Sequence, residues 1–333
     1  MRTCAQAETG VSRLQPETLL MTKTTRKWRE LAASVGFLNW LFNPLQRSDV
    51  RSVYDLLLEQ SPTTRARYLN LGYWAGLEPG ENTGADSLDD ACDALVRLVG
   101  KRAGLGADDR LLDVGFGFGD QDLLWWREFA PKRIVGLNIT ASQVAVARKR
   151  VAAQELSQQI DLRLGSATAM PVAAGSVDVI IALECAFHFQ TRERFFAEAL
   201  RVLRPGGRLV LADIIPMPLV AGGGERWQQR LTWALVAGKF AIPKANAYPL
   251  ASYVDKLAEA GFAPVEVESI RHDVYQPLHA HLREHPDILA RLHPLLAFAV
   301  RLALKADAKT LFSGLDYVLA SAIKPGGAPA VPG

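Results

Sequence analysis

Several residue types and patterns are scarce in this sequence, and each scarcity excludes a class of protein. Only three cysteines occur in 333 residues, Cys4, Cys92 and Cys185, and their spacing matches neither a disulfide framework nor a zinc site. Such usage is typical of a reducing compartment, so we expect a cytoplasmic protein. No apolar run approaches the roughly 18–20 residues that a membrane span needs, which argues against stable membrane insertion.

Charge of one sign is also scarce. The formal net charge is only +3, and the basic residues are not gathered into one long run, so nucleic acid is not an expected partner. The sequence shows no cluster of histidine, cysteine and acidic residues with the spacing of metal ligands, so we expect no metal. The first twenty residues lack the apolar block of a signal peptide.

Apolar residues, by contrast, are abundant. They make up 49% of the chain against 22% charged residues, which is enough to bury a sizeable core. In the middle of the chain, short apolar runs alternate with helical patterns, as is typical of a parallel sheet with crossover helices. We therefore predict an α/β fold with seven strands. They span residues 110–117, 133–139, 161–167, 177–184, 208–215, 265–271 and 317–323.

Helical stretches outside this repeating pattern predict a lid and a cap. Residues 21–86 are rich in tryptophan, phenylalanine and tyrosine, and we expect an N-terminal helical lid there. The α/β domain then spans residues 87–325, with helical insertions at about 217–249 and 272–314. We expect these insertions to cap the carboxyl ends of the strands, where open α/β sheets bind ligands.

The two ends of the chain carry little information about the fold. Residues 1–20 are predicted to be a disordered lead, and Met21 is an alternative start. Residues 326–333 are rich in glycine and proline and are predicted to be a disordered tail. The sequence does not fix the oligomeric state, and a homodimer is one option.

The strongest local signal is a glycine-rich turn between the first predicted strand and the helix after it. Gly115, Gly117 and Gly119 let the backbone turn sharply and approach a ligand closely. A dinucleotide-binding fold would have a further glycine at position 120, which is Asp120 here, and no Gly-Lys-Ser/Thr sequence of a P-loop is present. Acidic residues in the first helical turn also disfavour a pyrophosphate. The pattern favours a cationic ligand without phosphate, and S-adenosylmethionine is such a ligand.

The second predicted strand ends on a polar residue. Asn138 stands 23 residues after Gly115, where nucleotide-binding α/β proteins hold ribose hydroxyls. A carboxylate is usual at this place, but an amide can both donate and accept hydrogen bonds. We interpret Asn138 as a ribose-binding residue, with a simple turn residue as the alternative.

Five motifs in series resemble those of class I S-adenosylmethionine-dependent methyltransferases. The resemblance covers roughly residues 65–325 and implies a Rossmann-like, seven-stranded, mostly parallel sheet sandwiched by helices, a helical cap over the active site, and S-adenosylmethionine as the cofactor. The stretches 68–76 and 182–207 more specifically resemble the small-molecule group typified by the erythromycin sugar O-methyltransferase. The motifs are LLDVGFGFGD (111–120), VGLNIT (135–140), GSATAMP (165–171), VIIALECAFHF (179–189) and LRPGGRLVLADI (203–214).

The resemblance implies a set of cofactor-binding residues. The glycines of the turn at 115–119 would let the backbone meet the methionine end of the cofactor, and Gln143 lies near enough to assist the ribose-binding amide. Ser166 and Ala167 stand where relatives recognise adenine. Tyr73 could close over the cofactor, because aromatic faces attract cations, or it could anchor the N-terminal segment in the core.

Methyl transfer is a displacement at a sulfonium carbon, so the protein mainly aligns nucleophile and methyl group. A hydroxyl nucleophile gains from a base, and His188, with an ordinary pKa of roughly 6.5, suits that role. Asp213 could orient His188, in a pair that resembles one in related sugar methyltransferases. Glu184 could hold the cofactor's ammonium group or reach the substrate. We interpret Arg192 as part of a solvated helix face.

The leading functional hypothesis is O-methylation of a hydroxyl on a small apolar specialised metabolite, such as a glycosylated polyketide. The alternative enzyme is a C-methyltransferase that acts on an isoprenoid, such as a prenyl diphosphate, or on an aromatic carbon. O-methylation predicts that His188 carries most of the rate, whereas C-methylation predicts that Glu184 does. A non-enzyme alternative is a membrane-surface binding module, because the aromatic segment 28–45 follows several basic residues.

Overall fold

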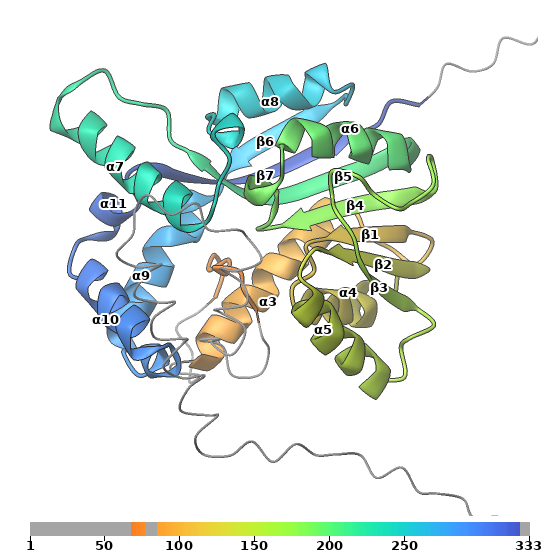
Figure 1. Cartoon of the computed structure of the whole chain (residues 1–333), viewed down its shortest axis with the longest axis horizontal. Coiled ribbons are helices and arrows are strands. Elements are labelled where there is room, and N and C mark those ends of the chain that lie inside the picture. Colours follow the sequence, from red (N-terminus) through yellow and green to blue (C-terminus); the bar gives the residue numbers. More distant parts are fainter. Residues whose placement is uncertain (1–67, 78–84, 327–333) are drawn as a thin grey trace, which may run out of the picture.

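The computed structural model describes residues 68–77 and 85–326, which contain a seven-stranded sheet. Its strands are β1 (Arg110–Val114), β2 (Arg133–Asn138), β3 (Ile160–Leu164), β4 (Val177–Leu183), β5 (Leu203–Pro216), β6 (Val265–Ser269) and β7 (Leu315–Ile323). They lie in the order β3-β2-β1-β4-β5-β7-β6, and all neighbours are parallel except β5–β7 and β7–β6 (Figure 1). The predicted fold class, a mostly parallel seven-stranded sheet, is confirmed.

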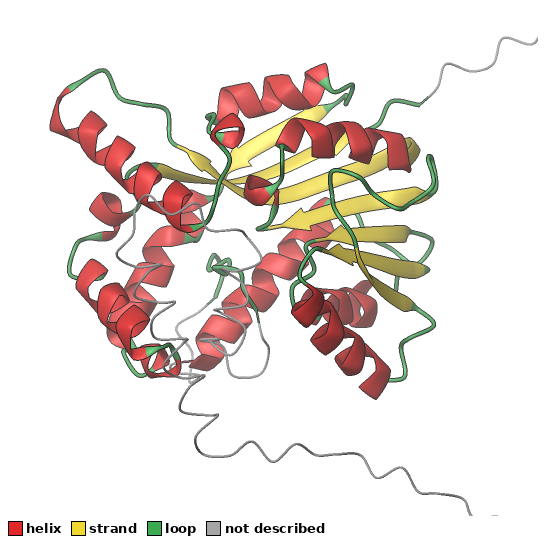
Figure 2. Cartoon of the chain, viewed as in Figure 1, coloured by secondary structure: helices red, strands yellow, loops and turns green. Residues whose placement is uncertain are grey.

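Helices cover both faces of the sheet (Figure 2). One face carries α3 (Ala85–Arg102), α4 (Asp120–Phe129) and α5 (Ala141–Ala153), and the other carries α6 (Arg192–Val202) and α8 (Leu250–Glu259). Successive residues of a strand point to opposite faces, so each strand feeds two separate cores. In β4, Ile181 belongs to the core under α3 to α5, and Ile180 belongs to the core under α6 and α8.

Further helices gather on the side of the sheet toward which β4 points (Figure 1). The segment 217–249 contains α7 (Gly223–Lys239), and the segment 272–314 contains α9 (Tyr275–Glu284), α10 (Pro294–Ala303) and α11 (Ala308–Leu311). Most of the predicted N-terminal lid, including the aromatic segment 28–45, lies outside the described residues. The whole predicted lead and all of the predicted tail except Gly326 also lie outside them.

Strand β5 begins at Leu203, five residues before the predicted start at 208. Leu203 pairs with Val177 of β4, and the register then shifts by the time Val179 pairs with Arg208. The backbone of Gly206 meanwhile donates a hydrogen bond to the carbonyl of Lys324 at 2.8 Å. Gly206 has a left-handed backbone, with φ at 75°, so the strand continues through an irregularity at the Pro-Gly-Gly sequence, which predicts a break.

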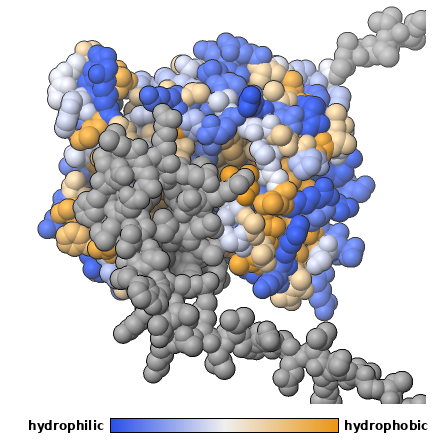
Figure 3. All heavy atoms as spheres, viewed as in Figure 1, coloured by the Kyte–Doolittle hydropathy of each residue, from blue (hydrophilic) through white to orange (hydrophobic). Residues whose placement is uncertain are grey.

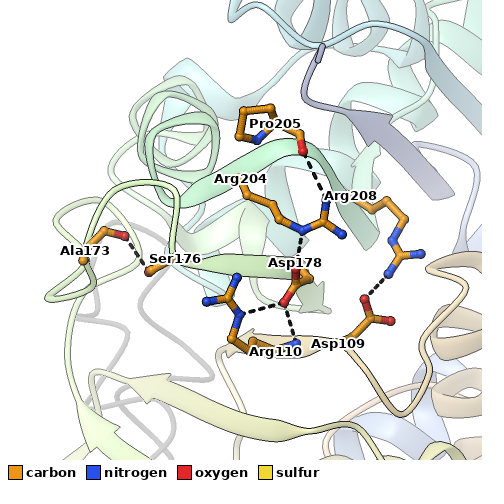
Figure 4. Close-up of polar contacts among 8 residues, drawn as sticks. All are labelled: Asp109, Arg110, Ala173, Ser176, Asp178, Arg204, Pro205 and Arg208. Atoms are coloured by element: carbon orange, nitrogen blue, oxygen red, sulfur yellow. Dashed lines mark hydrogen bonds and ion pairs between the residues drawn. The ribbon is translucent and has the colours of Figure 1, made fainter. Parts of the chain in front are cut away.

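Ion pairs tie the strands together at their amino ends (Figure 4). Asp178 of β4 accepts hydrogen bonds from the backbone N–H and the Nε of Arg110 at 2.8 and 2.9 Å, and it also pairs with Arg204. Burial alone would raise the pKa of Asp178, but the hydrogen bonds from Arg110 and Arg204 outweigh it and hold the pKa well below its usual range. Asp109 pairs with Arg208 beside them. Arg110, Arg204 and Arg208 therefore form ion pairs at the amino ends of the strands, opposite to the carboxyl ends where the candidate site lies.

The described part of the surface mixes hydrophilic and hydrophobic residues on the face seen in Figure 3. One ordered apolar stripe stands out on α7, where Trp227, Leu231 and Leu235 follow each other at intervals of four residues and are 66%, 40% and 51% exposed. Within residues 68–77 and 85–326, no helix combines the length and the apolar character that crossing a membrane requires.

Candidate active site

A cavity of about 160 Å³ lies at the carboxyl ends of β1, β2 and β4. This is the edge at which parallel α/β sheets bind ligands. Of the residues proposed from sequence, the cavity brings together Gly115, Gly117, Asn138, Gln143, Ser166, Ala167, Glu184 and His188. Its described lining comprises residues 68–70, 115–118, 120, 121, 137–140, 143, 165–168, 183–185 and 188–190.

The three glycines of the turn have different steric surroundings. All three are left-handed, with φ values of 84°, 55° and 80° for Gly115, Gly117 and Gly119. A Cβ on Gly115 would lie 2.6 Å from both Cβ and Sγ of Cys185, so this position has no room for a side chain. A Cβ on Gly117 would meet only Leu69, at 3.7 Å. Gly119 lies outside the lining, precedes α4 as its N-cap, and packs closely against Ala147 of α5.

This difference gives a matched pair of variants. We expect Gly115→Ala to lower the free energy of unfolding by about 1–3 kcal/mol more than Gly117→Ala, because both pay the left-handed backbone cost and only the first overpacks against Cys185. Urea unfolding of the two ligand-free variants measures the difference. Equal stability of the two variants would contradict the steric assignment of Gly115.

Amide side chains form the polar wall of the cavity. Asn138 Nδ2 donates to Gln143 Oε1 at 2.9 Å, and Asn138 Oδ1 accepts from the Thr140 backbone at 3.1 Å. Within the described part of the chain, the buried atoms Gln143 Nε2 and Asn70 Nδ2 have no hydrogen-bond partner. Buried donors of this kind are costly unless a ligand satisfies them. Asn70 and Gln143 both line the cavity, so their side-chain amides can donate to a bound ligand. The hydroxyls and the carboxylate of a nucleoside-amino acid are suitable acceptors.

The charge of the cavity suits a cation. Two carboxylates, Asp120 and Glu184, are among its lining residues, and none of the described lining residues is a lysine or an arginine. Arg150 pairs with Asp120 from outside the lining. A phosphate would find no lysine or arginine among the described lining residues, whereas a sulfonium or an ammonium group would find an acidic partner. The glycine turn, the unsatisfied amides and this charge pattern all fit S-adenosylmethionine.

Tyr73, expected to close over the cofactor, does not line the cavity. Its backbone N–H donates to the Ala91 carbonyl at 2.8 Å, and its side chain packs against the core under α3. The alternative interpretation, an anchor for the N-terminal segment, fits this contact. The same segment instead supplies Tyr68, Leu69 and Asn70 to the cavity. Sequence reasoning missed Asn70, although its position two residues before Gly72 in the YLNLGYW motif was a usable signal.

Glu184 follows directly after β4 and has a left-handed backbone, with φ at 50°. Such a conformation is strained for a residue with a side chain, and strained residues cluster at functional sites. Its Oε1 accepts hydrogen bonds from the Tyr317 hydroxyl at 2.6 Å and from the Leu71 backbone at 2.8 Å. Burial raises the pKa of Glu184 to about 7, against the opposing effect of these two hydrogen bonds. A carboxyl group poised near neutral pH can act as a general base.

His188 ends a short 3-10 helix, η1 (Ala186–His188), and also lines the cavity. Burial lowers the pKa of His188 to about 3, while a hydrogen bond with the Phe240 backbone opposes that shift. The ring packs against Phe187, with centroids 4.2 Å apart. Its environment therefore keeps the imidazole neutral and makes it a weaker base than the ordinary pKa of histidine suggests.

The expected pairing of Asp213 with His188 is wrong. Asp213 is fully buried and accepts hydrogen bonds from Arg192 Nε at 2.8 Å and from the Tyr253 hydroxyl at 2.9 Å. Residues alternate between faces along β5, so Asp213 points toward α6 and α8, while its neighbour Ala212 belongs to the opposite core. The interpretation of Arg192 as a solvated residue is also wrong, because its side chain is 0% exposed.

Arg192 and Asn246 together hold the segment that carries His188. Arg192 donates to the carbonyl of Asn246, and the Asn246 side chain accepts from the Arg192 backbone at 3.0 Å. The Asn246 amide then donates to the carbonyls of Phe187 and Phe189, at 3.0 and 2.9 Å. These are the two residues on either side of His188. Asn246 therefore links the buried ion pair of Arg192 and Asp213 by hydrogen bonds to the segment that lines the cavity.

A buried pair of acidic residues, Asp113 and Asp122, lies behind the glycine turn. Burial raises the pKa of Asp113 to about 7, and burial together with the nearby Asp113 charge raises that of Asp122 well above its usual range. Gln121, which lines the cavity, donates to Asp113 at 2.7 Å. Sequence reasoning used the acidic start of α4 only to argue against a phosphate and did not foresee this pair.

Known proteins share this architecture and its motifs. The methyltransferase domain family matches residues 112–211. The erythromycin 3''-O-methyltransferase of Saccharopolyspora erythraea is 36% identical over 288 residues, which cover 84% of this chain and 91% of that protein. The crystal structure of the cyclase SpnF has a TM-score of 0.59 at 25% identity and covers 89% of this chain and 96% of that chain.

A structure of geranyl diphosphate C-methyltransferase from Streptomyces coelicolor, in complex with Mg²⁺, geranyl-S-thiolodiphosphate and S-adenosyl-L-homocysteine, has a TM-score of 0.60 at 18% identity. The alignment covers 77% of this chain and 88% of that chain, and at this identity the similarity supports the fold alone. The cofactor of this enzyme is S-adenosylmethionine. The fold, the glycine turn and the similarity along nearly the whole of a named relative lead to one conclusion: the chain belongs to the class I S-adenosylmethionine-dependent methyltransferases, in the group of the erythromycin O-methyltransferase.

Proposed function

We propose that this enzyme transfers a methyl group to a hydroxyl oxygen of a glycosylated, polyketide-like metabolite. The observation that carries the proposal is the 36% identity to the erythromycin 3''-O-methyltransferase over 91% of that protein. The site is consistent with it, because Glu184, a buried carboxyl group with a pKa near neutrality, lines the cavity. A hydroxyl nucleophile needs such a proton acceptor when its oxygen forms the new bond.

Different residues of the cavity would bind different parts of the cofactor. When bound, S-adenosylmethionine supplies a methyl group on a positively charged sulfur, which makes that carbon open to displacement. The backbone at Gly115 and Gly117 lets a ligand approach closely, and the amides of Asn138 and Gln143 offer hydrogen bonds to ribose hydroxyls. Ser166 and Ala167 border the same cavity from the loop after β3, where the adenine would lie.

We assign the proton transfer to Glu184. Its Oε1 is engaged by Leu71 and Tyr317, and no residue in the described part of the chain donates to its Oε2. The Glu184 carboxylate would take the proton of the substrate hydroxyl as its oxygen accepts the methyl group, with S-adenosylhomocysteine as the leaving group. His188, neutral because burial lowers its pKa to about 3, adds no positive charge that would repel a cation in the cavity. Asp213 acts at a distance, by fixing Arg192 and thereby the segment around His188.

The proposal is tested by incubating the purified enzyme with S-adenosylmethionine and three acceptors: a macrolide glycoside, its aglycone and geranyl diphosphate. We expect a mass gain of one methylene unit on the glycoside, located on a sugar oxygen by fragmentation, and none on the aglycone. Methylation of the prenyl carbon would overturn the proposal in favour of C-methylation. A product of unchanged mass would point to cyclisation, the activity for which the structural relative SpnF is named.

A further inference from the structure

Two distant parts of the chain converge on one oxygen of Glu184. The Tyr317 hydroxyl donates to Oε1 at 2.6 Å, and the Leu71 backbone N–H donates to the same atom at 2.8 Å. Tyr317 lies 133 residues after Glu184, and Leu71 lies 113 residues before it. Tyr317 lies outside all the sequence motifs quoted above, so its contact with Glu184 is a feature that those motifs do not explain.

Packing fixes the position of the Tyr317 ring and therefore of its hydroxyl oxygen. It is fully buried in β7, opposite Ile214 of β5 in the antiparallel ladder. Its ring meets the Tyr275 ring edge to face, with centroids 5.9 Å apart, and Tyr275 in turn stacks on Phe312 at 4.6 Å. A side chain packed in this way loses little further freedom when it donates a hydrogen bond, so the bond to Glu184 is preorganised.

We propose that Tyr317 is a positioning residue for methyl transfer, which orients the Glu184 carboxylate and stabilises its ionised form. The inference rests on the proposed function, in which Glu184 accepts the proton. Because Tyr317 occupies Oε1, the second carboxylate oxygen is the one left to meet the substrate hydroxyl. Tyr317 thus determines which oxygen of Glu184 takes the proton as well as how readily it does so.

The electrostatics of the pair agree with this geometry. Burial raises the pKa of Glu184, and the hydrogen bond from Tyr317 is the largest effect that opposes it. Burial and the adjacent Glu184 charge raise the pKa of Tyr317 well above its usual range, so the phenol keeps its proton and donates it to the hydrogen bond. The other titratable groups that interact with Glu184 lie on α3, α9, β5 and the loop after β4. They are Cys92, Tyr275, Asp213 and Cys185.

The test is Tyr317→Phe, which removes the hydroxyl and keeps the packed ring. Without this donor the ionised form of Glu184 is less stable, so the pKa of Glu184 should rise by about one to two pH units. The acid limb of the kcat/KM profile should move up by the same amount, and activity should recover at high pH. A structural defect alone would lower the profile without moving its limb.

Tyr275→Phe is the matched control. It also removes a buried hydroxyl, which bonds to the Asp316 carbonyl at 3.3 Å, and it leaves the Glu184 hydrogen bonds in place. We expect its acid limb to stay within a few tenths of a pH unit of the wild-type value. An unmoved limb in Tyr317→Phe, or an equal movement in both variants, would overturn the proposal.

A readout that needs no substrate separates this inference from the proposed function. The infrared band of the protonated Glu184 carboxyl group, assigned by its loss in Glu184→Gln, can be titrated in the wild type and in Tyr317→Phe. A higher midpoint in Tyr317→Phe supports the Tyr317 link, and an unchanged midpoint overturns it. A moved infrared midpoint with an unmoved activity profile overturns both the proton-acceptor role of Glu184 and the positioning role of Tyr317 that depends on it.

Discussion

Glu184→Gln is expected to lower kcat/KM for O-methylation by about 100- to 10,000-fold while S-adenosylmethionine still binds. Glutamine has the shape of glutamate, and its amide oxygen can still accept hydrogen bonds from Leu71 and Tyr317, so the local structure is retained. What the variant lacks is a group able to take a proton near neutral pH. Steady-state kinetics with a methylated product readout gives the rate, and calorimetry with S-adenosylmethionine gives the affinity.

His188→Gln is the comparison that decides between the two candidate proton acceptors. The sequence alone favours His188, but burial lowers the pKa of this residue to about 3, which makes the ring a poor proton acceptor at neutral pH. We therefore expect His188→Gln to lose clearly less activity than Glu184→Gln. If the order of the two losses is reversed, the proton acceptor is His188, and the raised pKa of Glu184 serves another purpose.

Asp213→Asn is expected to lower the free energy of unfolding by about 3–5 kcal/mol. The substitution leaves the guanidinium of Arg192 charged and without its carboxylate in a place that is 0% exposed. Removing one partner of a buried ion pair is far more costly than the net contribution of the pair, because the remaining charge stays desolvated. Chemical denaturation of the ligand-free protein measures the loss.

Glu193→Gln provides the matched control, because Glu193 lies on α6, the helix that carries Arg192. Glu193 pairs with Lys256 at 2.8 Å, but the two side chains are 36% and 31% exposed, so water screens the pair and its loss should cost about 0–1 kcal/mol. A double variant, Asp213→Leu with Arg192→Met, should regain part of the loss, since no isolated charge then remains. Similar losses in Asp213→Asn and Glu193→Gln would contradict the buried network described above.

The parts of the site that could be read from the sequence are those that local pattern determines. A turn whose glycines follow a short apolar run, such as Gly115 after β1, is visible because its backbone demands are local. Asn138 at the end of β2 was found for the same reason, as the strand pattern fixes where the strand ends. The fold class followed from the alternation of strands and helices.

Features that depend on the direction of a side chain are harder to predict from the sequence. Asp213 was expected beside His188 because neighbouring parallel strands end close together, but closeness of strand ends does not say which face a residue points to. Alternation with Ala212 and Ile214 held that information, and it placed the carboxylate under α6. The pKa of His188 could not be foreseen either, because it depends on burial that the segment acquires only in the folded chain.

The contact between Tyr317 and Glu184 had no sequence signal at all. Tyr317 lies in an apolar strand and reads as a core residue, and only the insertion of β7 beside β5 brings its hydroxyl to the end of β4. Asn70 did have a local signal, its place in the YLNLGYW motif, but its position at the cavity depends on the tertiary fold, because its segment precedes the whole sheet in sequence. Long-range pairing of this kind is decided by topology and not by composition.

The position of Tyr317 in the chain has a consequence for biosynthesis. A ribosome makes the glycine turn and Glu184 well before it makes β7, and the nascent chain already contains the residues proposed to bind S-adenosylmethionine. The proton acceptor, however, receives its orienting phenol only when the last strand of the sheet has been inserted. Because β7 also supplies Leu319 to one core and Val318 to the other, a prematurely terminated chain is expected to lack both a stable sheet and an oriented proton acceptor, which makes catalytic turnover a marker of completed synthesis.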